Sequence, residues 1–104
     1  MPITLSDLAL KDLEEIRHYT VRQWGREQWL RYYRGLVSTF ERIEQSPESG
    51  RSRDLFLPGL RSISYGKHSV FYAPIAAAGG AIVILRIVHQ KRHLPALTYY
   101  EDIE

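Results

Sequence analysis

Six basic or imidazole side chains in the second half of the sequence are the residues best suited to carry chemistry. They are Arg61, Arg86, His89, Lys91, Arg92 and His93. Guanidinium and ammonium groups bind the oxygens of a phosphodiester, and a histidine or tyrosine beside them can donate a proton during its cleavage. A fold that gathers these residues on one concave surface would therefore bind a phosphodiester and assist its cleavage.

A structural interpretation competes with this one for two of the arginines. Arg86 lies within an apolar run, where a guanidinium needs a partner, and an ion pair would satisfy it without any chemistry. Arg61 has a similar alternative, because Asp54 or a helix carboxylate would serve as its partner. The residue types alone leave both interpretations open.

The charges of the chain are separated along the sequence. Between residues 51 and 93, seven lysines and arginines accompany the single acid Asp54, a net charge of +6, whereas the rest of the chain carries −4. Such a separation predicts a positive surface that meets an anionic partner, either a nucleic acid or an acidic protein. The alternative is that these bases are scattered groups that only keep the surface hydrated.

Several classes of site are not supported by the sequence. The chain has no cysteine, which excludes disulfides and thiol catalysis. The glycines at 59, 66, 79 and 80 fall in turns rather than in a phosphate-binding loop, and the histidines at 68, 89 and 93 lack the carboxylates and spacing of a metal site. We therefore expect no metal and no cofactor.

The length and composition predict one domain that spans residues 1–104. A chain of 104 residues, 44% of them hydrophobic, can bury one core and no more. The sequence has neither a signal peptide nor an apolar run near the ~20 residues that a membrane span requires. We accordingly expect a cytoplasmic protein with no membrane partner.

The basic cluster follows the most apolar stretch of the chain, residues 82–88, which Arg86 alone interrupts. This stretch predicts a central strand that is buried on both faces. Side-chain alternation divides it into two sets, Val83, Leu85, Ile87 and His89 on one face and Ile82, Ile84, Arg86 and Val88 on the other. One face should pack on helices and the other should be open, with the pattern leaving undecided which is which.

Two amphipathic helices should cover the sheet. The first, from about residue 6 to 24, has the apolar stripe Ala9, Leu13, Ile16, Thr20 and Trp24, with Asp12 among the residues outside it. The second, residues 26–45, has the stripe Trp29, Tyr33, Leu36, Phe40 and Ile43. Gly25 joins them into an antiparallel hairpin. Gly35, inside the second helix, indicates either close approach of a neighbouring backbone or a tolerated loss.

The remaining elements complete an α+β fold. Residues 60–65, 69–75 and 82–88 lie close enough in sequence to form an antiparallel meander, and residues 2–5 form an edge strand. The predicted architecture is an N-terminal strand and an antiparallel helical hairpin packed on a three- to four-stranded antiparallel sheet.

The order and spacing of many short pieces resemble the ParE branch of the RelE/ParE superfamily of bacterial toxins. The pieces are Leu5-Ser6, Ala9, Asp12-Leu13, Ile16, Tyr19-Thr20, Trp24-Gly25, Tyr33 to Leu36, Pro47, Gly50-Arg51, Pro58 to Arg61, Gly66 to His68, Val70 to Tyr72 and Ile84 to Gln90. The resemblance covers about residues 3–92 and leaves residues 93–104 as a C-terminal tail. It implies the RelE/ParE-like fold, with the N-terminal segment pairing as an additional strand.

The resemblance also implies a toxin of a type II toxin-antitoxin pair. RelE-like members are ribosome-dependent mRNA endonucleases whose open sheet face carries several lysines and arginines and a C-terminal tyrosine, whereas ParE-like members lack that set and are associated with poisoning DNA gyrase. This chain has no lysine cluster before the meander, and Tyr99 and Tyr100 lie beyond Leu94-Pro95 in an acidic tail. Arg61 and Arg86 match positions shared across the superfamily, so they do not argue for a nuclease.

We therefore expect an inhibitor that binds DNA gyrase and has no catalytic residues, so that it is not an enzyme. The alternatives are a RelE-like mRNA endonuclease and a non-toxic interaction module left from a decayed toxin gene. The target-interaction candidates are the six residues Arg61, Arg86, His89, Lys91, Arg92 and His93.

The resemblance further implies a ParD-like antitoxin, which lays an amphipathic helix in an apolar groove of the toxin. We expect this contact on the helical hairpin and the sheet edge, with Tyr32, Val37, Phe40 and Tyr72 as candidates. No sequence-specific nucleic-acid binding is expected of the toxin alone.

Overall fold

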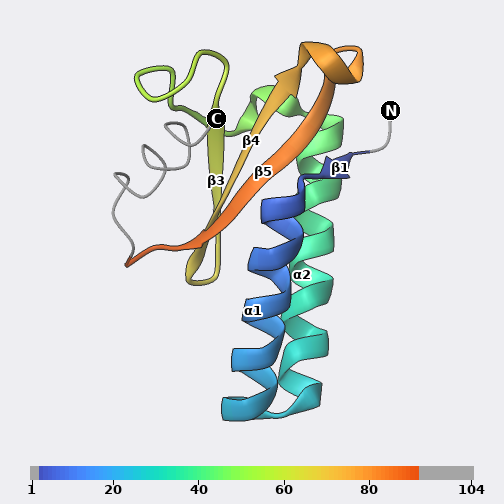
Figure 1. Ribbon diagram of the computed structural model, residues 1–104. Coiled ribbons are helices and arrows are strands. Elements are labelled where there is room, and N and C mark those ends of the chain that lie inside the picture. The colour runs from blue at the N-terminus through green and yellow to red at the C-terminus, as the bar shows by residue number, and fades with distance from the viewer. Residues whose placement is uncertain (1–2, 92–104) are drawn as a thin grey trace.

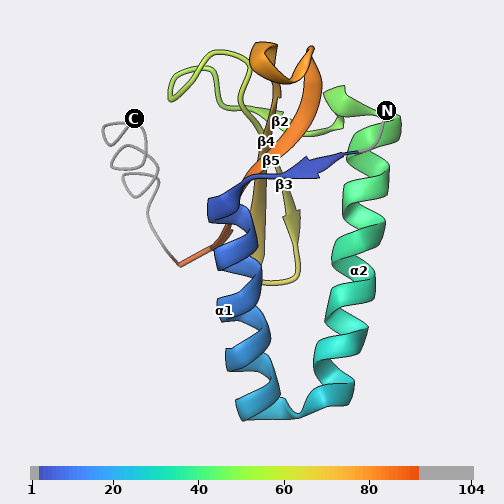
Figure 2. The same cartoon turned by 45° about the vertical axis from the view of Figure 1, so that its right-hand side comes forward.

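The computed structural model describes residues 3–91, so Arg92, His93 and the predicted tail lie outside the described residues. The elements in chain order are β1 (Thr4–Leu5), α1 (Asp7–Trp24), α2 (Arg26–Gln45), the 3-10 turn η1 (Pro47–Ser49), β2 (Arg51–Ser52), β3 (Arg61–Tyr65), β4 (His68–Ile75), the 3-10 turn η2 (Ala76–Ala78) and β5 (Ala81–His89). The two helices lie side by side, and their lower half extends past the turn between β3 and β4 (Figure 1, Figure 2).

The predicted α+β architecture is confirmed, and the sheet is larger than the meander alone. Its five strands have the order β1-β5-β4-β3-β2. Strands β3, β4 and β5 are antiparallel neighbours, and β2 adds a short antiparallel pair beside β3. Strand β1 is the additional N-terminal strand, and it pairs parallel with β5, which makes the sheet mixed.

The helices begin and end where local signals place them. The Ser6 side chain caps α1 by accepting a hydrogen bond from the Ala9 N–H at 3.0 Å. Gly25 joins the helices with a φ of 92°, a conformation that glycine adopts without steric cost. The predicted stripe of α1 is wrong at its last residue, because Trp24 is 70% exposed. The reason is geometric: this end of the hairpin extends past the sheet, so no strand lies beneath it (Figure 1).

The core lies between the hairpin and the sheet. Its buried members from α2 are Leu36, Phe40 and Ile43, and those from the sheet include Ile63, Val70, Tyr72, Ile84 and Ile87. A smaller cluster on the opposite face joins Leu60, Phe71 and Val88 with the partly buried Phe56, Leu57 and Leu85. The prediction of an open second face is therefore wrong in this region, because the segment after β2 covers part of it.

A β-bulge changes which residues of β5 face the helices. Arg86 pairs with Phe71 and Ile84 pairs with Tyr72, which leaves Leu85 without a direct partner on β4. An extra residue of this kind reverses the alternation of side chains beyond it. Ile84 and Ile87 consequently pack in the same core, although strict alternation assigned them to opposite faces. The predicted division of this strand is wrong for that reason.

Helix α1 covers the edge of β5 that β1 leaves unpaired. The Ser6 hydroxyl donates to the Leu85 carbonyl at 2.8 Å, and the Ser6 N–H donates to the Ile84 carbonyl at 2.9 Å. Further along the helix, the Asp12 carboxylate accepts the Ile87 N–H at 2.9 Å. The helix therefore satisfies strand groups that would otherwise be open to a neighbouring chain.

Asp12 also binds Arg86 with both of its oxygens. Arg86 Nε donates to Oδ2 at 2.8 Å, and Nη2 donates to Oδ1 at 2.9 Å. Asp12 is 8% exposed, so its assignment to the polar side of α1 is wrong. The carboxylate is tolerated there because a charge-assisted, two-point contact and a backbone N–H together occupy it. Arg86 therefore forms an ion pair in apolar surroundings, as the structural interpretation of this residue predicts.

Gly35 allows α2 to approach a side chain rather than a backbone. A methyl group at this position would overlap the Tyr65 ring and hydroxyl. The same hydroxyl donates to the Tyr32 carbonyl at 3.1 Å, which ties β3 to the middle of α2. The expectation of close packing is met, with the aromatic ring of Tyr65 in place of a neighbouring main chain.

The first prediction concerns Asp12. We expect Asp12→Ala to lower the free energy of unfolding by about 3–5 kcal/mol, because it leaves a partly buried guanidinium and the buried Ile87 N–H without their carboxylate. Asp12→Asn keeps an acceptor for the Ile87 N–H, so its free energy of unfolding should lie between those of the parent protein and Asp12→Ala. Urea unfolding followed by circular dichroism measures both. The control is Glu14→Ala, which removes an exposed helix ion pair with Arg17 and should leave the free energy of unfolding close to that of the parent protein, because water screens such a pair. Equal losses for Asp12→Ala and Glu14→Ala would contradict this interpretation.

The second prediction concerns Gly35. Alanine is favoured over glycine in a helix by about 1 kcal/mol, yet we expect Gly35→Ala to destabilise the protein by about 1–3 kcal/mol, because Tyr65 must move out of its packed position. Ser38→Ala, at an exposed position of the same helix, is the matched control. Thermal unfolding compares the two variants. A melting temperature for Gly35→Ala at or above that of the parent protein would show that the Tyr65 contact carries no stability.

Candidate functional site

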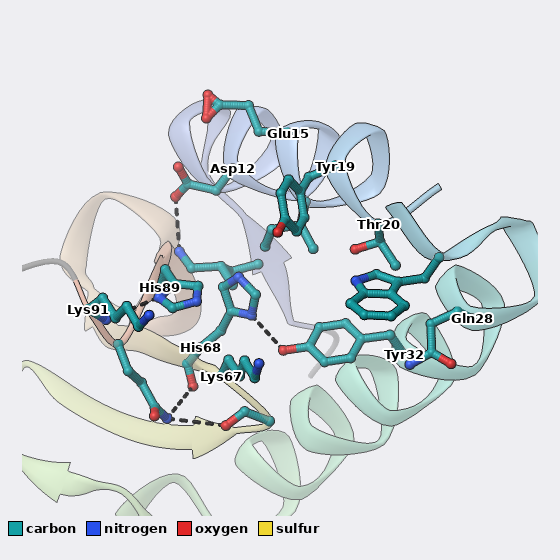
Figure 3. Close-up of a pocket in the computed structure, with 15 residues that line it drawn as sticks. Asp12, Glu15, Tyr19, Thr20, Gln28, Tyr32, Lys67, His68, His89 and Lys91 are labelled. Carbon is teal, nitrogen blue, oxygen red and sulfur yellow. Dashed lines mark hydrogen bonds between the residues drawn. The ribbon is translucent and has the colours of Figure 1, made fainter. Parts of the chain in front are cut away.

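A cleft of about 1170 Å³ opens between the lower part of the hairpin and the adjacent end of the sheet. Side chains of α1 and α2 form one wall, among them Asp12, Glu15, Tyr19, Trp24 and Tyr32. Lys67, His68, His89 and Lys91, from the β3–β4 turn, β4 and the end of β5, form the other wall. Figure 3 shows these two groups of side chains on either side of the space.

The sheet wall is fixed by bonds between the end of β5 and the β3–β4 turn. His68 and His89 are direct cross-strand partners. The Gln90 N–H donates to the Lys67 carbonyl at 2.8 Å, and the Gln90 side chain donates to the His68 carbonyl at 3.2 Å. Gly66, at a φ of 55°, makes the tight turn that presents Lys67. These contacts hold Lys67, His68 and His89 on one rigid surface.

The proton positions of His68 and Tyr32 follow from their hydrogen bonds. The Tyr32 hydroxyl donates to the Tyr65 carbonyl at 3.1 Å and lies 2.5 Å from His68 Nδ1 (Figure 3). With the hydroxyl proton directed at the Tyr65 carbonyl, a hydrogen bond to His68 requires the tautomer that carries its proton on Nδ1 and leaves Nε2 as an acceptor. Burial lowers the pKa of His68 to about 4, with a further contribution from His89, and raises the pKa of Tyr32 to about 12. Both groups are therefore neutral at pH 7.

His89 has the opposite arrangement. Its Nδ1 accepts the Lys91 N–H at 3.1 Å, so the proton of the neutral ring lies on Nε2, which acts as a donor. The His68 and His89 rings meet edge to face with their centroids 5.3 Å apart. The pair thus combines one acceptor nitrogen and one donor nitrogen on the same wall.

The charges of the two walls differ. Lys67 and Lys91 are exposed, and neither forms an ion pair with a carboxylate among residues 3–91. On the helix wall the Asp12 carboxylate is matched by Arg86, which leaves Glu15 as the acid of the cleft without an ion pair within that range. Ammonium donors therefore lie across the cleft from aromatic rings, and the Glu15 carboxylate is on the same helix as Tyr19 (Figure 3).

The structure brings together only part of the predicted basic surface. His89 and Lys91 line the cleft, and Arg86 lies beside it in its pair with Asp12. Arg61 is at the other end of β3, where it donates to the Gly50 carbonyl at 2.8 Å and supports the turn before β2. The prediction that Arg61 converges with the others is wrong, because β4 separates its strand from β5 and its guanidinium is bound to a carbonyl.

Two of the four antitoxin candidates are core residues. Phe40 is buried, and Tyr72 is 1% exposed, with its hydroxyl donating to the Pro47 carbonyl at 2.7 Å and accepting the Gly50 N–H at 2.9 Å. Their side chains cannot meet a partner while the fold is intact, so their assignment to an accessible groove is corrected. Tyr32 and Val37 are half-buried, and Tyr32 lines the cleft.

Sequence reasoning did not select several residues of the cleft as site residues. They are Asp12, Glu15, Tyr19, Trp24, Lys67 and His68. One signal was present for Asp12, since the arginine inside an apolar strand required an acidic partner and the first helix carries acids beside its stripe. Nothing in the local pattern linked Tyr19 or Trp24 to His68, because these residues meet only when the hairpin lies against the sheet.

The described part of the chain gives no sign of a metal centre or of a membrane span. Residues 3–91 contain no group of three or more histidine and acidic side chains that could hold a metal ion. Among the same residues, neither helix is long and apolar enough to cross a bilayer. Donors and aromatic side chains line the cleft, and the strand arginine next to it is held by a carboxylate.

Three comparisons agree on the family. A family model described as "ParE toxin of type II toxin-antitoxin system, parDE" matches residues 3–94. Toxin ParE1 of Mycobacterium tuberculosis is 37% identical over 87 residues, which cover 84% of this chain and 87% of that protein. Toxin ParE1 of Caulobacter vibrioides is 35% identical over 95 residues, which cover 91% and 95% of the two chains.

Solved structures give the same result. A chain of the "Chromosomal ParDE TA system from P. aeruginosa" has a TM-score of 0.69 and 25% identity, with 86% of this chain and 95% of that one covered. The isolated E. coli RelE toxin has a TM-score of 0.55 and 15% identity over 98% and 97% of the chains, a likeness of fold alone. On the match of residues 3–94 and on these relatives, the chain belongs to the ParE toxin family of type II toxin-antitoxin systems.

Proposed function

We propose that this toxin acts in the cytoplasm by binding DNA gyrase, that it performs no chemistry of its own, and that a ParD-like antitoxin neutralises it. The observation that carries the absence of chemistry is the Asp12 contact with Arg86, at 2.8 and 2.9 Å. A guanidinium bound by a carboxylate with two oxygens is already neutralised, which makes it a poor group to stabilise the charge of a phosphodiester transition state.

The position of Arg61 supports the same proposal. Its guanidinium donates to the Gly50 carbonyl and so serves the turn between η1 and β2. The two arginines at positions shared across the superfamily therefore have structural roles in this chain. The RelE likeness, at 15% identity, concerns the fold and adds no support for an endonuclease.

The cleft is the surface that we assign to the target. His89 and Lys91 line it, whereas the other two predicted target residues of the described chain are bound elsewhere, Arg61 by the Gly50 carbonyl and Arg86 by Asp12. A charged rim of this kind steers association with an oppositely charged partner. For the antitoxin, the ParDE system named for the P. aeruginosa relative supports a ParD-like partner. Val37 on α2 and Tyr32 beside the cleft remain the contacts that we propose for it.

The third prediction tests gyrase as the target. Purified toxin should inhibit DNA supercoiling by gyrase, and the double variant His89→Ala/Lys91→Ala should require about tenfold more protein for the same inhibition, equal to about 1.4 kcal/mol of binding. Lys11→Ala, an exposed lysine of α1 outside the cleft, is the control for removal of a positive charge and should behave as the parent protein. Added ParD-like antitoxin should restore supercoiling.

The alternatives give different results in the same preparation. Cleavage of mRNA in a translating ribosome extract, with supercoiling untouched, would replace gyrase binding by the endonuclease function. Absence of growth inhibition on induction of the folded protein would instead indicate a decayed module without toxicity.

A further inference from the structure

The two walls of the cleft differ in a way that suits one kind of ligand. The sheet wall presents the ammonium groups of Lys67 and Lys91 and the Nε2–H of His89, three donors that have no acceptor among residues 3–91. The helix wall presents the rings of Tyr19 and Trp24, which are 62% and 70% exposed. Donors for an anion thus face flat aromatic surfaces that nothing in the described chain covers.

We propose that the cleft binds a short stretch of single-stranded nucleic acid directly. One phosphodiester contacts Lys67, His89 and Lys91, and an adjoining base stacks on Tyr19 or Trp24. Phosphate contacts and base stacking on aromatic rings are the two interactions by which proteins bind single strands without reading their sequence. A volume of about 1170 Å³ is large for a small-molecule site, and it leaves room for more than one nucleotide.

The fixed proton of His89 strengthens the anion side of the cleft. Because its Nδ1 is occupied by the Lys91 N–H, the ring presents a donor and never an acceptor at its outer nitrogen. The same bond orients Lys91 and His89 together at the end of β5. His68 cannot compete for the phosphate as a cation, since burial lowers its pKa and keeps it neutral.

A single strand fits these observations better than the other anionic partners do. A duplex hides its base faces, so the exposed rings of Tyr19 and Trp24 would have no counterpart. An acidic peptide carries its charges on flexible side chains and offers no aromatic partner at a fixed distance from them. Glu15 on the helix wall opposes any anion, which gives the proposal a further consequence that can be measured.

The fourth prediction is a binding measurement by fluorescence anisotropy. Fluorescein-labelled twelve-nucleotide dT and rU strands should bind the purified toxin with a micromolar Kd at low salt. Lys67→Ala/Lys91→Ala should weaken binding at least tenfold and lower the slope of log K against log salt by about 0.7, the value for the one phosphate that loses both of its ammonium contacts. Lys11→Ala is the matched control and should keep the affinity and the slope of the parent protein.

The stacking half of the site has its own variants. Tyr19→Ala and Trp24→Ala should each weaken oligonucleotide binding by about tenfold while leaving the salt slope unchanged, because they remove stacking and no charge. Glu15→Gln should tighten binding by removing the opposing carboxylate. All of these side chains are exposed or line the cleft, so circular dichroism should show that the variants remain folded.

Three outcomes would overturn the proposal. The first is that Lys67→Ala/Lys91→Ala binds single strands as tightly as Lys11→Ala does. The second is that a twelve-base-pair duplex binds as tightly as the single strand. The third is that a poly-glutamate peptide displaces the strand while Tyr19→Ala and Trp24→Ala leave its binding unchanged. The last would make the cleft an acidic-protein site.

The inference deepens the proposed function by naming the chemistry that the cleft recognises. It can nevertheless fail separately, because oligonucleotide binding is measured without gyrase. Supercoiling inhibition without oligonucleotide binding would refute the nucleic-acid site and leave the gyrase proposal intact. Oligonucleotide binding without supercoiling inhibition would refute the gyrase proposal and leave the nucleic-acid site intact.

Discussion

The contact between helix α1 and the free edge of strand β5 is the constraint on which the rest of the structure depends. Asp12 accepts the Ile87 N–H and binds Arg86 with both oxygens, while Ser6 donates to the Leu85 carbonyl. Strand β1 covers only the beginning of that edge. The helix therefore acts as the continuation of the sheet, and a single buried carboxylate compensates a strand amide and a strand guanidinium at once.

This contact decides where the hairpin lies and hence where the cleft is. With α1 fixed against β5 near its N-terminal end, the second half of the hairpin continues past the sheet (Figure 1). Tyr19 and Trp24 therefore remain exposed, and they face the end of β5 and the β3–β4 turn instead of packing on strands. The cleft follows from a helix that is longer than the sheet it covers, and Tyr32, which is bonded to Tyr65 and His68, lines it.

The same arrangement leaves some basic side chains bound within the fold and others exposed at the cleft. Arg61 and Arg86 look alike in sequence to the bases that follow them, yet each is bound by a partner, Arg61 by the Gly50 carbonyl and Arg86 by Asp12. Lys67 and Lys91 lie in turns beside the cleft, where water hydrates their ammonium groups until a partner displaces that water. The two strand arginines of this ParE family member are therefore occupied within the fold, whereas the two lysines are exposed.

The sequence by itself determined the features that depend on neighbours along the chain. The helix bounds, the Gly25 turn and the antiparallel meander follow from local propensity and hydrophobic period, and the order of motifs indicated the family. Tertiary structure alone decided the burial of Asp12, the reversal of side chains after the bulge at Leu85, the exposure of Trp24 and the placement of Tyr19 and His89 in one cleft. The physical reason is that a periodic pattern records only which face of an element is apolar. The packing of separate elements decides which partner a charged group finds and where one element extends past another.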